Sequence, residues 1–216
     1  LHIFGDEILN IKYYWFKKFN LGDIKLLISR TGWSSEHGYE IFLLDSSKGN
    51  KLYEILMKEG EPLGLYAGHT STIRRIEGGM LSYHSDMDIN TNPLELGMDK
   101  FIELDKKFDF IGKDALIKIN ESGIKNKQVG LVIDTKPLKG PNTNKWRILY
   151  KNKCIGKVTS AVYSPRLELN IALAIVKIEY SDINSVLEIE IKDTLVNAKV
   201  VEKPFFDPKK LIAKQN

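Results

Sequence analysis

The stretch IGKVTSAVYSPRLELNIALAIV, residues 155–176, decides how the second half of the chain folds. It contains two apolar segments rich in Val, Ile and Ala, and the dipeptide Ser164-Pro165 lies between them. Short apolar runs bounded by turn residues are typical of buried β-strands. We therefore predict strands over residues 155–162 and 171–178.

Four further apolar runs surround this pair and extend the β pattern over the rest of the second half. They cover residues 129–133, 146–150, 186–191 and 198–201. Turn residues separate them, among them Pro137, Gly140-Pro141, Asn152 and Asp182. Strands at such close spacing are typical of a small β-barrel or a β-sandwich, so we predict that this half is all β.

The first half mixes strands with helices. Apolar runs at residues 24–29 and 39–44 predict two strands, and a helix capped by Ser46 or Ser47 follows and ends at Gly60. Two further helices are expected over residues 70–77 and 113–121 because apolar side chains there recur at helical spacing. The fold class that follows is α+β.

A polar linker at residues 122–127 marks the expected domain boundary. The predicted division is one domain over residues 1–124, a β domain over residues 125–206 and a solvated tail over residues 207–216. The chain opens as if a domain were already under way, so we expect an upstream part of the protein, without which this portion is inactive.

Composition excludes several classes of partner. The 216 residues are 43% hydrophobic and 28% charged, as is usual for a folded globular protein. No apolar run approaches the roughly 20 residues of a membrane helix, and the net charge of +4 is spread along the chain. We therefore expect neither a membrane nor a nucleic acid as partner. The single cysteine, Cys154, fits a reducing compartment, so we predict a cytoplasmic location.

Standard catalytic motifs are missing from the sequence. The four histidines have no cysteine or carboxylate neighbours at the spacing of metal ligands, so no metal site is predicted. Neither a phosphate-binding glycine loop nor a Gly-x-Ser-x-Gly nucleophile turn occurs. Any chemistry must therefore come from less standard segments.

The first such segment is the loop at residues 30–40, where Trp33, Glu36 and Tyr39 lie close to two glycines. A carboxylate can accept hydrogen bonds from the N–H groups of a heterocycle while an aromatic ring stacks on its face. The alternative interpretation is a surface hairpin loop in which Trp33 is a hydrophobic plug.

The second segment runs over residues 73–88. Arg74 and Arg75 lie on a predicted helix and could grip a carboxylate, and the pair Gly78-Gly79 would let a ligand approach the backbone. The alternative is a helix whose surface arginines pair with Glu77. Neither segment decides the function by itself.

These segments carry a family resemblance. RTGWSSEHGYE (30–40) resembles the signature RTGYTGEDGFE of the folate-dependent aminomethyltransferases, the family typified by the glycine cleavage system T-protein. RIEGGMLSY (75–83), NPLE (92–95), FIGKDAL (110–116) and GKVTSA (156–161) resemble later blocks of that family, in family order. The resemblance covers nearly the whole chain.

The resemblance implies a tetrahydrofolate-binding α+β body followed by a C-terminal β-barrel. It further implies that Glu36 contacts the pterin or the transferred group, that Arg75 binds a carboxylate and that Tyr83 lines the pocket, with Trp33 and Tyr39 as further folate or substrate contacts. The family's catalytic aspartate is expected upstream of this chain, so the catalytic residue is unknown here.

Five departures from the family pattern bear on the reaction: Trp33 for Tyr, Ser34-Ser35 for Thr-Gly, His37 for Asp, His84 for Gly and Ala161 for Gly. We interpret them, with the segments around Tyr13 and Tyr83, as favouring the dimethylsulfoniopropionate demethylase branch. Its enzymes move a methyl group from a sulfonium to N5 of tetrahydrofolate, so the predicted partner is a small-molecule methyl donor. Aromatic rings could hold such a cation.

Three alternatives stay open. The first is the glycine cleavage aminomethyltransferase, which forms 5,10-methylenetetrahydrofolate and would dock a lipoyl carrier protein. The second is a related folate-dependent demethylase of sarcosine or dimethylglycine type. The third is a non-enzymatic folate-binding relative that serves iron–sulfur assembly, which is disfavoured because the only cysteine lies in the β half.

Overall fold

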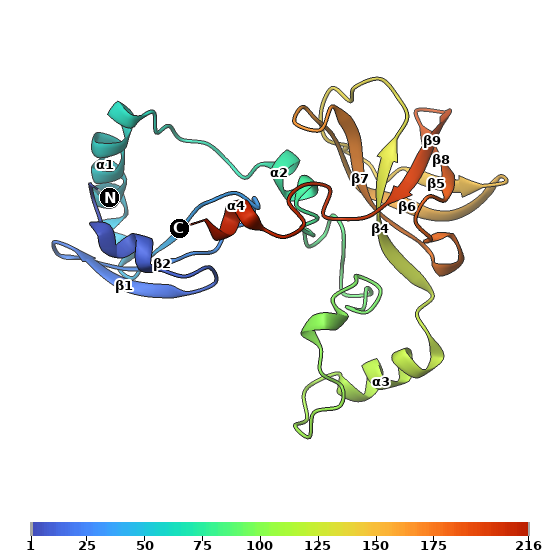
Figure 1. The fold of residues 1–216 in the computed structure, drawn as a ribbon, viewed down its shortest axis with the longest axis horizontal. Helices are drawn as coiled ribbons and strands as arrows, with labels where there is room; N and C mark the ends of the chain where they lie inside the picture. The colour runs from blue at the N-terminus through green and yellow to red at the C-terminus, as the bar shows by residue number, and fades with distance from the viewer. Residues whose placement is uncertain (1, 216) are drawn as a thin grey trace. The chain divides into compact units, whose positions relative to one another are not determined.

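A computed structural model describes residues 2–215, and these residues form two compact units (Figure 1). The first unit comprises the residues up to Ser71 together with the segment from Lys209 onward. The second, here called the barrel unit, comprises Thr72–Pro208. Each unit is described by itself.

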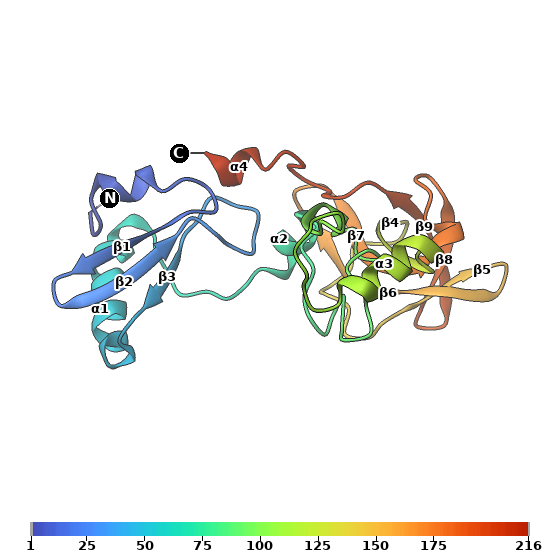
Figure 2. The ribbon, with the colours of Figure 1, turned by 90° about the horizontal axis from the view of Figure 1, so that it is seen from below.

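The first unit is a three-stranded antiparallel sheet with a helix on one face (Figure 2). The strands are β1 (Phe16–Leu21), β2 (Ile24–Ser29) and β3 (Glu40–Leu43), in the order β1-β2-β3, and the helix is α1 (Gly49–Gly60). Residues 24, 26 and 28 of β2 are fully buried because alternate side chains of a strand point to the same face. Leu52 of α1 packs in the same cluster.

The start of α1 differs from the prediction. Neither Ser46 nor Ser47 caps it; Asp45 accepts a hydrogen bond of 3.0 Å from the Ser47 N–H and caps the short 3-10 helix Ser46–Lys48. The helix α1 then begins at Gly49, with no side-chain cap. A carboxylate two residues earlier competes successfully for the free N–H groups, because Asp forms such local bonds readily.

The barrel unit contains a closed six-stranded antiparallel barrel, which confirms the predicted β half and selects the barrel over the sandwich. The strand order is β4-β7-β6-β5-β8-β9. The strands are β4 (Asn126–Ile133), β5 (Arg147–Tyr150), β6 (Lys153–Ser164), β7 (Leu169–Lys177), β8 (Val186–Ile191) and β9 (Thr194–Val201). Their inward side chains form one continuous apolar cluster.

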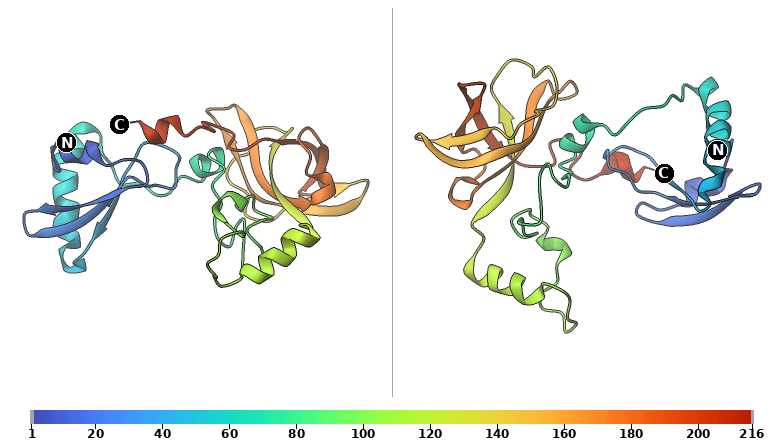
Figure 3. Two further views of the ribbon diagram at one scale, coloured as in Figure 1. Left: turned by 60° about the horizontal axis from the view of Figure 1, so that its bottom comes forward. Right: turned by 180° about the vertical axis from the view of Figure 1, so that it is seen from behind.

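Two helices precede the barrel, at the predicted places: α2 (Thr72–Glu77) and α3 (Lys113–Ser122). Figure 3 shows α3 and the connecting loops before it outside the barrel. Ile76 of α2 is fully buried in a second apolar cluster with Val162, Ile171 and Leu173 of the barrel strands. This packing places the compact boundary at Ser71, whereas the domain boundary at residue 124 stays a prediction from the sequence pattern.

Short helices complete the described chain. The 3-10 helices are Asp6–Asn10, Glu61–Leu63, Asp99–Phe101 and Ile178–Tyr180, and the last helix is α4 (Leu211–Lys214). Within residues 2–215, no helix has the length and apolar character that crossing a membrane requires.

The chain between Pro204 and the predicted tail at residues 207–216 packs on the barrel unit. Phe205 packs against the cluster around Ile76, and the Phe206 N–H donates to the Glu77 carbonyl at 3.0 Å. Further on, Ala213 is only 3% exposed. Leu211, two residues before it, is by contrast 62% exposed.

Candidate functional site

The loop that follows β2 carries three of the predicted site residues. Backbone hydrogen bonds tie its start to the segment before β1: the Arg30 N–H donates to the Trp15 carbonyl at 2.8 Å, and the Tyr14 N–H donates to the Arg30 carbonyl at 3.0 Å. At its end, Glu40 accepts a hydrogen bond from the Thr31 hydroxyl. The loop is therefore closed at its base, and the residues between are held as a compact turn.

Within this loop the predicted contacts differ in exposure. Trp33 is 38% exposed, and Glu36 is half-buried with its N–H donating to the Ser34 hydroxyl at 3.3 Å. Tyr39 instead packs against the core of the first unit, and its hydroxyl donates to the Ile8 carbonyl at 3.3 Å. Trp33 and Glu36 are thus at least partly accessible to solvent, whereas the Tyr39 ring is part of the packing of the first unit.

His37 lies on the same loop with its ring edge-on to Tyr39, 5.6 Å between ring centres. Burial lowers the pKa of His37 from its ordinary value, and the positive charge of Arg30 lowers it further. The imidazole is therefore held toward its neutral form, which can donate and accept a hydrogen bond at once.

From the sequence, Arg30 is recognised only as the first residue of the signature, and its burial is not predicted. Its side chain is 1% exposed, and its Nη2 donates to the backbone carbonyls of Ala213, at 2.9 Å, and of Gln215. Its guanidinium also lies 5.2 Å from the centre of the Tyr39 ring. Nη1 has no hydrogen-bond partner among the described residues.

In the barrel unit, Arg75 is buried, being 5% exposed, and has an internal carboxylate partner. Its Nη1 donates to Asp86 Oδ2 at 2.8 Å, and its Nη2 donates to the Ser160 hydroxyl at 2.7 Å. Asp86 is 1% exposed and also accepts from the hydroxyls of Thr159 and Ser160, each at 2.6 Å. Arg75 therefore joins α2 to strand β6 through a buried polar network.

The neighbouring arginine fits the alternative interpretation. Arg74 pairs with Glu77 at 2.9 Å, and Glu77 is buried, accepts from the Ser164 hydroxyl at 2.6 Å and lies 3.6 Å from Arg166. A buried carboxylate needs such partners, because an unpaired one would lose its hydration without compensation. Glu77 is thus a structural anchor of α2.

The glycine pair after α2 also has an internal explanation. Gly79 has a φ of +65°, and a Cβ atom there would lie 3.4 Å from the Cα of Pro204. The close approach that we expected from a ligand is made by the chain itself. Tyr83, by contrast, is 52% exposed, with the ring of His84 4.4 Å from its own.

Lys203 is a second cation that sequence reasoning missed. Its ammonium donates to the side-chain carbonyl of Gln128. Burial lowers the pKa of Lys203 from 10.5 to about 8; the charges of Lys100 and Lys127 lower it further, and that of Asp86 opposes them.

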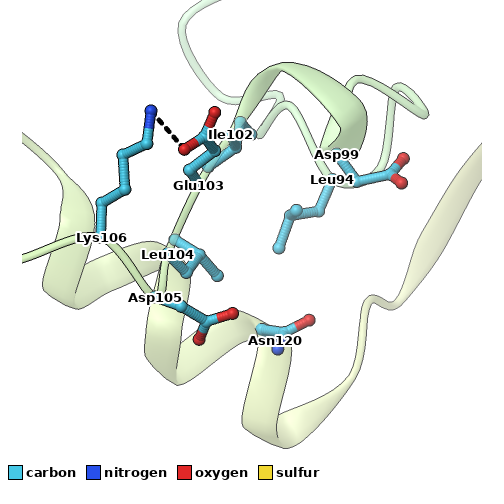
Figure 4. A pocket seen from close by; sticks show the side chains of 8 residues that line it. All are labelled: Leu94, Asp99, Ile102, Glu103, Leu104, Asp105, Lys106 and Asn120. Carbon is cyan, nitrogen blue, oxygen red and sulfur yellow. Dashed lines mark ion pairs between the residues drawn. The ribbon is translucent and has the colours of Figure 1, made fainter.

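One hollow of the barrel unit lies away from all these residues (Figure 4). Its lining includes Leu94, Asp99, Asp105 and Asn120, with an ion pair between Glu103 and Lys106 at its rim. None of the predicted site residues lines it. Within residues 2–215, no group of histidine, cysteine and carboxylate side chains is arranged to hold a metal ion.

Comparison with protein families matches both parts of the chain. The family described as "GCVT N-terminal domain" matches residues 5–106, and the one described as "Glycine cleavage T-protein C-terminal barrel domain" matches residues 126–207. The second match coincides with the six barrel strands.

Curated relatives and a solved structure agree with these matches. The aminomethyltransferase of Oceanobacillus iheyensis is 34% identical over 211 residues, which are 93% of this chain and 54% of that protein. The aminomethyltransferase of Prochlorococcus marinus is 34% identical over 212 residues, 95% of this chain and 55% of that protein. The chain thus spans about half the length of these relatives.

The fold is also seen in the crystal structure of the glycine cleavage system aminomethyltransferase T from Bartonella henselae. The TM-score is 0.76 at 21% identity, over 89% of this chain and 52% of that one. The chain is thus an α+β protein with a C-terminal barrel of the aminomethyltransferase type. It contains a GCVT N-terminal domain match followed by a glycine cleavage T-protein C-terminal barrel domain match.

Proposed function

We propose that the protein is a tetrahydrofolate-dependent aminomethyltransferase of the glycine cleavage type. The observation that carries this proposal is the match to proteins named aminomethyltransferase at 34% identity over 93% of the chain. The reaction would form 5,10-methylenetetrahydrofolate from an aminomethyl group held on a lipoyl carrier protein, with release of ammonia. The proposed partners are therefore tetrahydrofolate and that carrier, and the proposed compartment is the cytoplasm.

This proposal reverses the order of our sequence-based hypotheses, and the backbone supports the reversal. Two of the departures that favoured the demethylase branch, Ser35 and His84, have φ values of +59° and +69°. Such left-handed positions suit glycine, the residue that the family pattern has there. These substitutions therefore act on backbone conformation and carry little information about the one-carbon donor.

A sulfonium demethylase remains the second candidate because Trp33 is partly exposed on the signature loop. An indole face attracts a cation, and a sulfonium methyl donor is a cation. The two candidates need different donors and yield different folate products, so one experiment separates them.

For the site we propose that Trp33 and Glu36 contact the pterin or the group being transferred. Tyr83 is proposed as a pocket-lining ring and Tyr39 as the support on which the loop rests. A carboxylate ligand of Arg75 would have to compete with Asp86, so we propose that this arginine acts chiefly by holding the segment around Tyr83.

The test uses the protein expressed from its complete gene, incubated with tetrahydrofolate and either an aminomethyl-lipoyl carrier protein or dimethylsulfoniopropionate. Mass spectrometry of the folate should show 5,10-methylenetetrahydrofolate with the carrier and no 5-methyltetrahydrofolate with the sulfonium. The opposite pattern would establish the demethylase, and no product from either donor would overturn both.

The site assignment is tested by measuring the tetrahydrofolate affinity of the variant Glu36→Gln. Loss of a charge-assisted hydrogen bond to the pterin should weaken folate binding about tenfold or more. The matched control is Glu59→Gln, the same change at an exposed position on α1. Equal folate affinity of the two variants would remove Glu36 from the site.

A further inference from the structure

The most unusual charge in the first unit is that of Arg30. Its side chain is 1% exposed, yet no carboxylate pairs with it among the residues that the structure describes, where only carbonyl oxygens accept its hydrogen bonds. Burial of a charge without a counter-ion is costly, and carbonyl dipoles offset only part of that cost. Nη1, with no partner, adds the cost of an unmade hydrogen bond.

A carboxylate or phosphate group is a better partner for a planar guanidinium than two separate carbonyls are. Carboxylate and phosphate groups accept two parallel hydrogen bonds from its fork and also neutralise its charge. Such an oxyanion would satisfy Nη1 and Nη2 together. The charge of Arg30 also acts on a neighbouring group, because it helps to lower the pKa of His37.

The segment that covers Arg30 buries little apolar surface. It comprises residues 209–215, including the four-residue helix α4, and Ala213 is the residue it buries. Leu211 is 62% exposed, and Lys210 is attached to the signature loop by a hydrogen bond of 2.7 Å from its ammonium to the Ser35 hydroxyl. A segment with so little buried apolar surface opens at low free-energy cost.

We propose that Arg30 anchors a binding site for a small oxyanion, a carboxylate or a phosphate group, and that residues 209–215 form a strap whose backbone carbonyls close this site in the absence of the anion. Binding of the anion exchanges two neutral acceptors for one charged, bidentate acceptor. The strap is then released from Arg30. Because the strap also holds Ser35, anion binding is coupled to the loop that carries Trp33 and Glu36.

Limited proteolysis tests the release of the strap. Trypsin cleaves after lysine, and Lys209 and Lys210 lie at the start of the strap. Added inorganic phosphate or glutarate should raise the rate of cleavage at these two bonds at least about threefold over sodium chloride of equal ionic strength. An effect of phosphate alone assigns a phosphate ligand, and one of glutarate alone assigns a carboxylate. No effect of either overturns the proposal.

The variant Arg30→Gln should abolish the anion effect on cleavage, whereas Arg147→Gln, at an exposed arginine of the barrel unit, should retain it. An anion effect that persists in Arg30→Gln would contradict the assignment. A second readout needs no substitution at Arg30: the pKa of His37, measured by NMR and assigned with His37→Gln, should rise when the anion neutralises Arg30. A pKa that stays constant across the anion titration would also contradict the site.

Discussion

Ser35 and His84 show that a departure from a family's sequence pattern can concern backbone conformation instead of the substrate. Both stand where the aminomethyltransferase pattern has glycine, and both have positive φ values, which cost an L-residue about 1–2 kcal/mol. Ser35 recovers part of this cost through its hydrogen bond from Lys210. His84 has an edge-on contact with the Tyr83 ring. The chain tolerates both residues because neighbouring contacts fix the backbone.

His84→Gly should therefore raise the free energy of unfolding by roughly 0.5–1 kcal/mol, the strain removed less the entropy that glycine adds to the unfolded chain. The measurement is urea denaturation. The control is His69→Gly, at an exposed position without positive φ, which should lower stability by a similar amount. Equal losses in both variants would show that His84 is unstrained.

Asp86 is the residue on which the buried network of the barrel unit depends. Asp86→Asn removes the negative charge that pairs with Arg75, and it weakens the bonds from Thr159 and Ser160. We expect the free energy of unfolding to fall by about 3–5 kcal/mol. The same change at exposed Asp105 should stay within about 0.5 kcal/mol. Similar small losses at both sites would mean that the ion pair is dispensable.

Lys203 should give the protein a measurable pH dependence. Its folded-state pKa of about 8 lies below the unfolded value of 10.5, so between these pH values the unfolded chain binds more protons. Stability therefore rises with pH across this window, by about 3 kcal/mol from this group. Unfolding curves of the wild type and Lys203→Met should diverge from pH 8 to 10.5, with Lys199→Met as the exposed control. Parallel curves would contradict the lowered pKa.

At the scale of elements, the barrel depends on close packing of β6 against β7. A Cβ atom at Gly156 would lie 2.2 Å from the Ile175 carbonyl oxygen and 2.8 Å from the Val176 Cα, both backbone atoms that cannot move aside cheaply. The register of these two strands also shifts between Val158 and Ser160. Glycine lets the strands approach just before this irregularity.

Gly156→Ala should accordingly destabilise the barrel unit by about 2–3 kcal/mol, because the added methyl group forces the strands apart. Loss of near-ultraviolet circular dichroism at lower urea concentration would report it. At Gly140 an added Cβ meets nothing within 4 Å, so Gly140→Ala should change stability by less than about 0.5 kcal/mol. A tolerated Gly156→Ala would show that the two strands have room to separate.

The elements differ in how well the sequence predicts them. The barrel strands are predictable because their apolar runs are bounded by turn residues, and β2 is found at residues 24–29 as expected. Strand β1 was missed because Lys17 and Lys18 interrupt it, and Phe19 is its only buried residue. The start of α1 was misplaced because three polar residues compete for the same N–H groups, and local spacing does not tell which one wins.

At the scale of the whole molecule, the sequence predicts the family and the loop but not the polar networks. Ser160 meets Arg75 from 85 positions along the chain, and Ala213 meets Arg30 from 183. No local sequence pattern predicts such pairings, because residues so far apart in the chain meet only when the chain folds. The ligand role expected for Arg75 came from its place in a motif. Its buried partner Asp86 lies in the same segment, but nothing in the sequence indicates that the two side chains pair.

The central claim is that this chain is part of an aminomethyltransferase whose product is 5,10-methylenetetrahydrofolate. The most direct measurement is mass spectrometry of tetrahydrofolate incubated with the protein from its complete gene and an aminomethyl-lipoyl carrier protein. The account predicts a product heavier than tetrahydrofolate by one carbon at the methylene oxidation level, together with free ammonia. Unchanged tetrahydrofolate in that mixture, with 5-methyltetrahydrofolate formed from dimethylsulfoniopropionate instead, would contradict it.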